Sequence, residues 1–207
     1  MALVKYNNNS LSAITEAASI ASGAMTLIKE QTASSSATIS FVHGTSDVVL
    51  DNTYPIYVFK FINIHPAADQ TFLTFQADTG TNTSYNQTIT STYFTAYHAE
   101  DDSGAALAYS ASYDQAQGTS FQYITDRTGT DNDQTVAGTL HLFNPSSSTF
   151  VKHFIAETNC YEQSNYTSQV FAAGYFNTAT ALTRVQFKMS SGNMDAGTIK
   201  LYGIKDS

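Results

Sequence analysis

The chain has 207 residues, with 9 Lys and Arg against 17 Asp and Glu, which gives a formal net charge of −8. Binding to nucleic acid relies on basic side chains that neutralise phosphates, so this acidic composition argues against a nucleic-acid partner. No run of about 18 apolar residues is present, so no membrane-spanning helix and no membrane partner is expected. The N-terminal residues also lack the apolar core of a secretory signal peptide, so none is expected.

The first predicted unit is an N-terminal arm over residues 1–24. Residues 10–24 are rich in Ala and Ser, and Leu11 and Ile14 lie at helical spacing on a thin apolar stripe. A short helix with so narrow a stripe is marginal in water unless it packs against something. We therefore expect an extended arm or a short helix, followed by one domain over residues 25–207.

Strand patterns dominate the rest of the chain, because apolar and polar side chains alternate there with a period of two. Residues 56–64 are apolar on both faces, which indicates a central strand covered on both sides. Residues 91–109 carry an acidic cluster and a run of small residues, and we expect a long loop with a turn of helix there. The predicted strands, in chain order, are 25–29, 37–42, 56–64, 71–76, 121–124, 139–143, 149–156, 168–176, 185–189 and 198–204.

Stretches rich in Gly, Asn, Asp and Ser separate these strands, as at residues 77–82, 128–133 and 190–197. Many short strands with such turns between them are typical of a β-sandwich or a β-barrel. The sequence therefore predicts an all-β fold, an antiparallel, jelly-roll-like β-sandwich with an N-terminal arm.

Residues with catalytic or metal-binding chemistry are sparse. The five histidines show no metal-binding spacing, and the acidic stretches 101–102 and 131–133 do not fit the calcium-loop pattern, which leaves a weak calcium site as a minor alternative. No nucleophile motif is present, and Glu157 and Glu162 are the only pair of glutamates near a strand. The single Cys160 is expected to be a partly buried strand residue. We predict a protein that is not an enzyme and has no metal, no cofactor and no catalytic residues.

Two tyrosine-rich stretches, residues 93–97 and 161–166, are the candidates for sugar binding. The chain has 13 Tyr and 13 Phe, but it lacks Trp, whose ring offers the largest face for stacking on a sugar. Aromatic residues at a period of two more often form the core of a sandwich. Recognition of a carbohydrate or a receptor is therefore an alternative function, which these two stretches would carry.

Several segments resemble a group of virion structural proteins of tailed bacteriophages, especially phages of marine bacteria. They are PIYVFKFINIHPA at 55–67, FNPSSSTFVKHFI at 143–155 and VQFKMSSGNMDAGTIKLYGI at 185–204, with ALVKYNNNSLSAIT and MTLIKEQTASSSATISF nearer the N-terminus. The resemblance covers most of the strands and rests on strand and turn patterns. It implies a structural role in the virion, which is assembled in the host cytoplasm.

Within the particle, the expected role is that of a capsid decoration (cement) protein on the exterior of the head. The major shell protein of a tailed phage is usually longer and mixed α/β, so a mostly β chain of this size fits an accessory part. Such a protein would bind the major capsid protein and would form a trimer or dimer with itself through a sandwich edge. Lys5, Tyr6, Leu11 and Ile14 of the arm would bind the shell. The alternatives are a tail or head-fibre protein that recognises a host surface glycan, and a hydrolase that acts on that surface.

Overall fold

The computed structural model describes residues 25–205, which form thirteen β-strands in two antiparallel sheets. The strands are β1 (Met25–Thr32), β2 (Ile39–Val42), β3 (Ile56–Pro66), β4 (Leu73–Thr79), β5 (Ile89–Ala99), β6 (Ala105–Tyr109), β7 (Ala116–Gly118), β8 (Gln122–Tyr123), β9 (Val136–Phe143), β10 (Lys152–Glu162), β11 (Tyr166–Phe176), β12 (Leu182–Met189) and β13 (Met194–Ile204). The large sheet has the order β1-β13-β3-β9-β10-β11-β5-β6, and β7 also pairs with β5. The small sheet has the order β2-β12-β4-β8.

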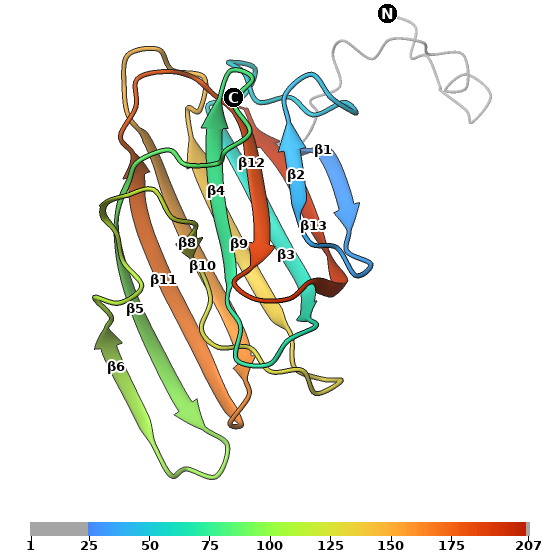
Figure 1. Cartoon of the computed structure of the whole chain (residues 1–207), viewed down its shortest axis with the longest axis vertical. Helices are drawn as coiled ribbons and strands as arrows, with labels where there is room; N and C mark the ends of the chain where they lie inside the picture. The colour runs from blue at the N-terminus through green and yellow to red at the C-terminus, as the bar shows by residue number, and fades with distance from the viewer. Residues whose placement is uncertain (1–24, 206–207) are drawn as a thin grey trace, which may run out of the picture.

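The two sheets form the layers of a β-sandwich, which confirms the predicted all-β class (Figure 1). The strands β2, β12 and β4 lie across the middle of the large sheet, whereas β6 and the adjoining end of β5 project beyond the small sheet (Figure 1). The large sheet therefore keeps part of its inner face uncovered by the small sheet.

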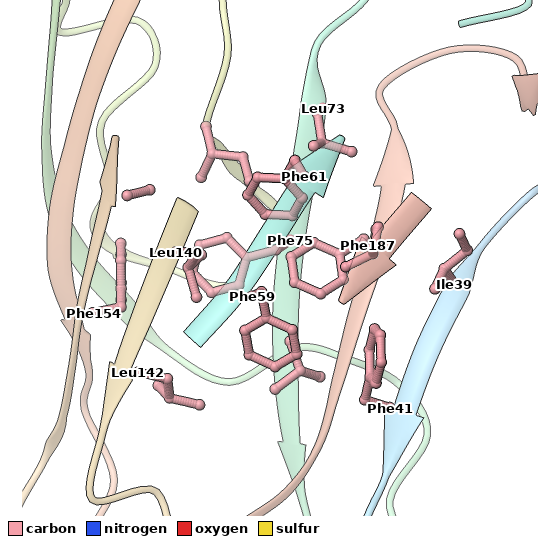
Figure 2. Close-up of a cluster of buried hydrophobic side chains, with 14 of the residues drawn as sticks. Ile39, Phe41, Phe59, Phe61, Leu73, Phe75, Leu140, Leu142, Phe154 and Phe187 are labelled. Atoms are coloured by element: carbon pink, nitrogen blue, oxygen red, sulfur yellow. The ribbon is translucent and has the colours of Figure 1, made fainter. Parts of the chain in front are cut away.

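Aromatic side chains fill the space between the two layers (Figure 2). From Val185 onward the strand β12 alternates strictly, with Val185, Phe187 and Met189 buried and the residues between them half exposed, as the sequence predicts. The Phe187 ring lies 5.0 Å from the ring of Phe59 on the opposite sheet and 6.2 Å from the ring of Phe75 on its own sheet. The core is therefore continuous from one sheet to the other.

Residues 91–109 form the hairpin of β5 and β6, so the predicted loop with a turn of helix is wrong. On β5, Ile89 and Tyr93 are buried on the inner face, as a strand requires. The alternation fades further along the strand, because Tyr97 on the inner face and Phe94 on the outer face are both exposed at 37%. The contrast between apolar and polar positions, which identifies a strand in a sequence, is lost there.

The strand β3 is central in the large sheet, between β13 and β9, as residues 56–64 predict. Its inner side chains, including Phe59 and Phe61, are buried in the core. The opposite face carries Ile56 and Lys60, which are half exposed, and Val58, which is 1% exposed, but no second layer among residues 25–205 covers that face. The expectation of cover on both sides is therefore wrong.

Residues 190–197, predicted as a turn, contain the start of β13 at Met194. The register of β13 against β3 shifts at Gly197, which has a φ of 110°. A Cβ atom on this glycine would lie 2.5 Å from the carbonyl oxygen of Asn63 and 2.6 Å from the Cα of Ile64. Only glycine fits this bulge, and its presence makes the segment look like a turn in the sequence.

The predicted arm over residues 1–24 lies outside the described residues, and so do its candidate shell-binding residues Lys5, Tyr6, Leu11 and Ile14. Within residues 25–205, no helix is long and apolar enough to cross a membrane.

Hydrogen bonds of Tyr57 hold the loop between β2 and β3 against the core. Its hydroxyl donates a hydrogen bond to the carbonyl oxygen of Asp51 at 2.9 Å and accepts one from the Asp51 N–H, also at 2.9 Å. The ring is fully buried, and burial raises the pKa of Tyr57 to about 12. The neutral phenol is therefore the form that the folded protein stabilises.

We expect the free energy of unfolding to fall at alkaline pH because of this contact. An unfolded tyrosine ionises near pH 10, so neutral Tyr57 contributes its full stability below that pH and loses it as the pH rises through about 12. Replacing Tyr57 with Phe should lower the free energy of unfolding by about 1–2 kcal/mol near neutral pH, because the Asp51 N–H loses its acceptor. The difference between the two proteins should shrink above about pH 10. Urea unfolding of both proteins at several pH values measures this, and a difference that does not change with pH would contradict it.

Candidate functional site

A groove of about 490 Å³ lies on the inner face of the large sheet, around β5 and the ends of β10 and β11. Five tyrosines are among the residues that line it, and we call it the tyrosine groove. Two carboxylates and an arginine lie in the same groove. Its lining includes Tyr93, Thr95, Tyr97, Ala108, Tyr109, Tyr113, Asp126, Arg127, Glu162, Tyr166 and Ser168.

The strand period places the tyrosines of the floor. Alternation along β5 puts Tyr93, Thr95 and Tyr97 on one face, and the antiparallel register sets Tyr97 opposite Ser168 on β11. The Tyr97 and Tyr166 rings lie 5.5 Å apart at an angle of 81°, so the two rings meet edge to face. Tyr97 is 37% exposed, so its ring is accessible to a ligand.

One wall of the groove comes from the segment 125–128, which follows β8 and crosses the inner face. The hydroxyl of Tyr93 donates to the carbonyl oxygen of Thr125 at 2.9 Å. The N–H of Thr128 donates to the carbonyl oxygen of Thr71 at 2.8 Å. The segment is thus anchored at both of its ends, which holds the two residues between them beside the groove.

Those two residues, Asp126 and Arg127, form a charged group with Glu162. The Nε atom of Arg127 lies 3.8 Å from Asp126 Oδ1 and 3.6 Å from Glu162 Oε1. The arginine side chain is 50% exposed, whereas the carboxylate side chains are 15% and 6% exposed. Ser168 donates its hydroxyl to Asp126 Oδ2 at 2.9 Å, and the N–H of Ser164 donates to Glu162 Oε2 at 2.7 Å. Fixed hydrogen bonds therefore orient both carboxylates.

Two protonated groups lie close to these charges. Burial raises the pKa of Tyr93 above its ordinary value, and the negative charge of Asp126 raises it further. Burial likewise raises the pKa of the Cys160 thiol to about 12, again with a contribution from Asp126. Cys160 is a strand residue, as predicted, but it is 1% exposed and therefore fully rather than partly buried. At neutral pH it is a thiol rather than a nucleophilic thiolate.

The two tyrosine-rich stretches of the sequence meet in this groove. Tyr93 and Tyr97 come from residues 93–97, and Tyr166 comes from residues 161–166. Tyr161 belongs to the second stretch, but it alternates with the inward Glu162 along β10 and therefore points to the outer face. The same alternation separates Glu157 from Glu162, since Glu157 is exposed on the outer face, so the two glutamates do not form a pair.

The residues missing from the sequence prediction are Tyr113, Asp126 and Arg127. They lie in loops, and no local pattern distinguishes them from other loop residues in a chain with 17 Asp and Glu. Only the contacts of Thr125 and Thr128 with distant strands bring Asp126 and Arg127 to the groove.

The acidic loops considered for calcium do not gather into a metal site. Among residues 25–205, no group of three or more His, Cys, Asp or Glu is arranged to hold a metal ion. The nearest approach is His98, whose Nε2 atom lies 3.2 Å from Asp102 Oδ1 with both side chains exposed. This contact is a solvated surface pair.

A ligand in the tyrosine groove would meet aromatic rings, two oriented carboxylates and a half-exposed guanidinium group. The three ionised side chains sum to a charge of −1, so the groove offers hydrogen-bond acceptors and donors without a strong attraction for anions. A concave site of this size with a few converging polar groups is typical of a small-molecule or oligomer binding site. No protein-family model, curated protein or solved structure matches this chain, so the chemistry of the groove itself is the basis for inferring its ligand.

Proposed function

We propose that this protein is a non-enzymatic component of a phage particle that recognises a neutral glycan in the tyrosine groove. The observation that carries the proposal is the meeting of the Tyr97 and Tyr166 rings with the charged group of Asp126, Arg127 and Glu162. The resemblance to virion structural proteins of tailed phages supports the particle role.

The chemistry of a sugar matches this combination of groups. A pyranose ring has apolar C–H faces, which pack on an aromatic ring, and hydroxyl groups around its edge. Carboxylates such as Asp126 accept hydrogen bonds from hydroxyls, and the guanidinium of Arg127 donates to them. Hydrogen bonds to charged groups are stronger than those between neutral groups, so a few of them orient a ligand that is otherwise well hydrated.

The charge of the groove favours an uncharged saccharide. A uronate, a sialic acid or a sulfated sugar would bring a negative charge next to Asp126 and Glu162, with only Arg127 to balance it. The whole chain carries −8, which repels an acidic polysaccharide at long range as well. We therefore expect the ligand to be a neutral glycan on a host surface.

The order of strands supports a jelly roll as the finer description of the sandwich. The pairs β1–β13, β2–β12, β3–β9 and β4–β8 are nested, with each inner pair lying within the chain between the strands of the next outer pair. Successive members of this series alternate between the two sheets, as in a double-sheet jelly roll. The strands β5, β6, β7, β10 and β11 then extend one sheet, and residues of β5, β6, β10 and β11 line the groove. Jelly rolls occur in both viral capsid and lectin domains, which agrees with the proposal.

Electrophoresis through gels that contain polysaccharide tests the glycan proposal. We expect at least one neutral glucan, mannan or galactan to retard the purified protein, with no retardation by polygalacturonate. The retardation should survive EDTA, because the proposed contacts need no metal. Retardation by the acidic polymer alone, or cleavage of any polymer, would contradict a non-enzymatic neutral-glycan site.

Decoration of the head is the second candidate function, in which the major capsid protein is the partner. The observation that favours it is the outer face of the large sheet, where Leu27, Phe94 and Ile155 are 48%, 37% and 49% exposed and no other layer among residues 25–205 covers them. Virions that lack the protein separate the two roles. Loss of heat resistance with normal adsorption supports decoration, whereas loss of adsorption with unchanged heat resistance supports glycan recognition.

A further inference from the structure

The strand β6 forms one edge of the large sheet and carries none of the usual protection of a free edge. Its sequence is AALAY, and all five residues are exposed. Leu107 is 73% exposed and Tyr109 is 56% exposed. Soluble proteins normally protect a free edge with charged residues, proline or a bulge, because unpaired backbone groups otherwise recruit another strand.

The opposite edge of the same sheet has these protections. The strand β1 carries Lys29 and Glu30, and a bulge interrupts its register between Leu27 and Lys29. The edges of the small sheet are short, with four residues in β2 and two in β8. Among the described strands at sheet edges, β6 therefore differs in being five residues long and free of charged residues, proline and bulges, which favours pairing with another strand.

Backbone geometry shows which groups of β6 are free. Next to β6, the Ser110 N–H donates to the carbonyl oxygen of Tyr93, and the Ala99 N–H donates to the carbonyl oxygen of Gly104. Hydrogen-bonded pairs alternate along an antiparallel ladder, so the backbone groups of the even-numbered residues 104–110 face β5. The N–H and C=O groups of Ala105, Leu107 and Tyr109 consequently point away from the sheet.

We propose that β6 pairs antiparallel with β6 of a second copy of this chain, about a two-fold axis at Leu107. The three outward residues are spaced symmetrically around Leu107, so this register sets Leu107 opposite Leu107 of the second copy and Ala105 opposite Tyr109. Each copy donates three N–H groups and accepts three in return. No charged side chain of β6 opposes the contact, and one closed two-fold interface covers both free edges at once.

This pairing would join two tyrosine grooves. Ala106 and Ala108 pair with Tyr97 and Thr95 of β5, so they share the inner face, and Ala108 lines the groove. Their small side chains leave the groove open towards the edge of the sheet. The second copy would continue the floor across the axis, so that one extended glycan chain could contact both grooves. This consequence rests on the proposed function, whereas the strand pairing does not.

Analytical ultracentrifugation of the full chain and of two variants at Leu107 tests the pairing. We expect the natural chain to dimerise, and Leu107→Pro to dimerise about 10–100-fold more weakly, because each copy loses the central N–H donor. The Leu107 N–H does not pair with β5, so proline at this edge position leaves the sheet intact, which circular dichroism checks. Leu107→Val keeps the donor and should still dimerise. A chain that stays monomeric at high concentration, or a dimer that is unaffected by Leu107→Pro, overturns the proposal.

A cysteine at the axis tests the register. The Cα atoms of a hydrogen-bonded antiparallel pair lie about 5.5 Å apart, within the range of a disulfide. Leu107→Cys should therefore form a covalent dimer on mild oxidation, while Phe150→Cys, at a residue that is also highly exposed, should not. The native Cys160 is buried and does not compete. Equal cross-linking of the two variants overturns the register. Glycan binding by monomeric Leu107→Pro would show that the groove functions even where the pairing fails.

Discussion

Replacing Phe187 with Ala should lower the free energy of unfolding by about 3–5 kcal/mol, the largest effect that we expect from a single substitution. The ring of this residue contacts Phe41 and Phe75 on the small sheet, at centroid distances of 6.3 and 6.2 Å. It also contacts Phe59 and Phe61 on the large sheet, at 5.0 and 5.3 Å (Figure 2). Removing it leaves a cavity between rings of both sheets, which they cannot fill without moving apart.

Urea unfolding of the purified variant measures this loss. Phe150→Ala is the matched control, because it removes the same side chain at a position that is 69% exposed and should change stability by less than about 0.5 kcal/mol. Phe187→Leu should lie between the two, since leucine refills part of the cavity. A loss below about 1 kcal/mol for Phe187→Ala would mean that the two sheets do not depend on this ring for their packing.

Replacing Tyr97 with Ala should weaken glycan binding about 30-fold, which corresponds to about 2 kcal/mol for a central aromatic contact. Tyr97 lines the groove and is 37% exposed, and its ring meets Tyr166. Tyr97→Phe keeps the ring and should retain most of the affinity if C–H packing dominates. Isothermal titration calorimetry with the neutral saccharide identified by electrophoresis measures the dissociation constants of the three proteins.

The matched control for this series is Tyr161→Ala. Tyr161 is a neighbouring tyrosine of the second tyrosine-rich stretch, but it lies on the outer face of the large sheet. Its removal should leave the affinity unchanged. If both alanine variants lose binding equally, the outer face rather than the groove contacts the ligand.

Sequence periodicity predicts the strands whose inner side chains are buried between the two sheets. Residues 185–189 and 198–204 alternate strictly and form parts of β12 and β13. Periodicity fails within residues 91–109, because β6 and the adjoining end of β5 extend beyond the small sheet. Their inner face meets the groove instead of the core, so polar and aromatic residues replace the aliphatic ones. The place where the pattern fails is thus the place where the candidate site lies, as expected when a binding surface departs from the rules of core packing.

The composition of the candidate site was predictable in part. The two tyrosine-rich stretches are visible in the sequence, and both contribute rings to one groove. The positions of Asp126 and Arg127 were not predictable, because hydrogen bonds between segments far apart in the chain place them. The sequence did not show that Glu157 and Glu162 lie on opposite faces of one strand. The predicted strand ended at residue 156, whereas β10 continues six residues further, to Glu162.

The nested pairing of the strands has a consequence for synthesis on the ribosome. The two strands nearest the C-terminus, β12 and β13, are interior to their sheets, with β12 between β2 and β4 and β13 between β1 and β3. Neither sheet can therefore be completed until residues 182–204 have been translated, and until then the earlier strands expose unpaired edges. A message truncated shortly before residue 182 would yield a chain that lacks an interior strand in each sheet, so a stop codon at that point should abolish folding.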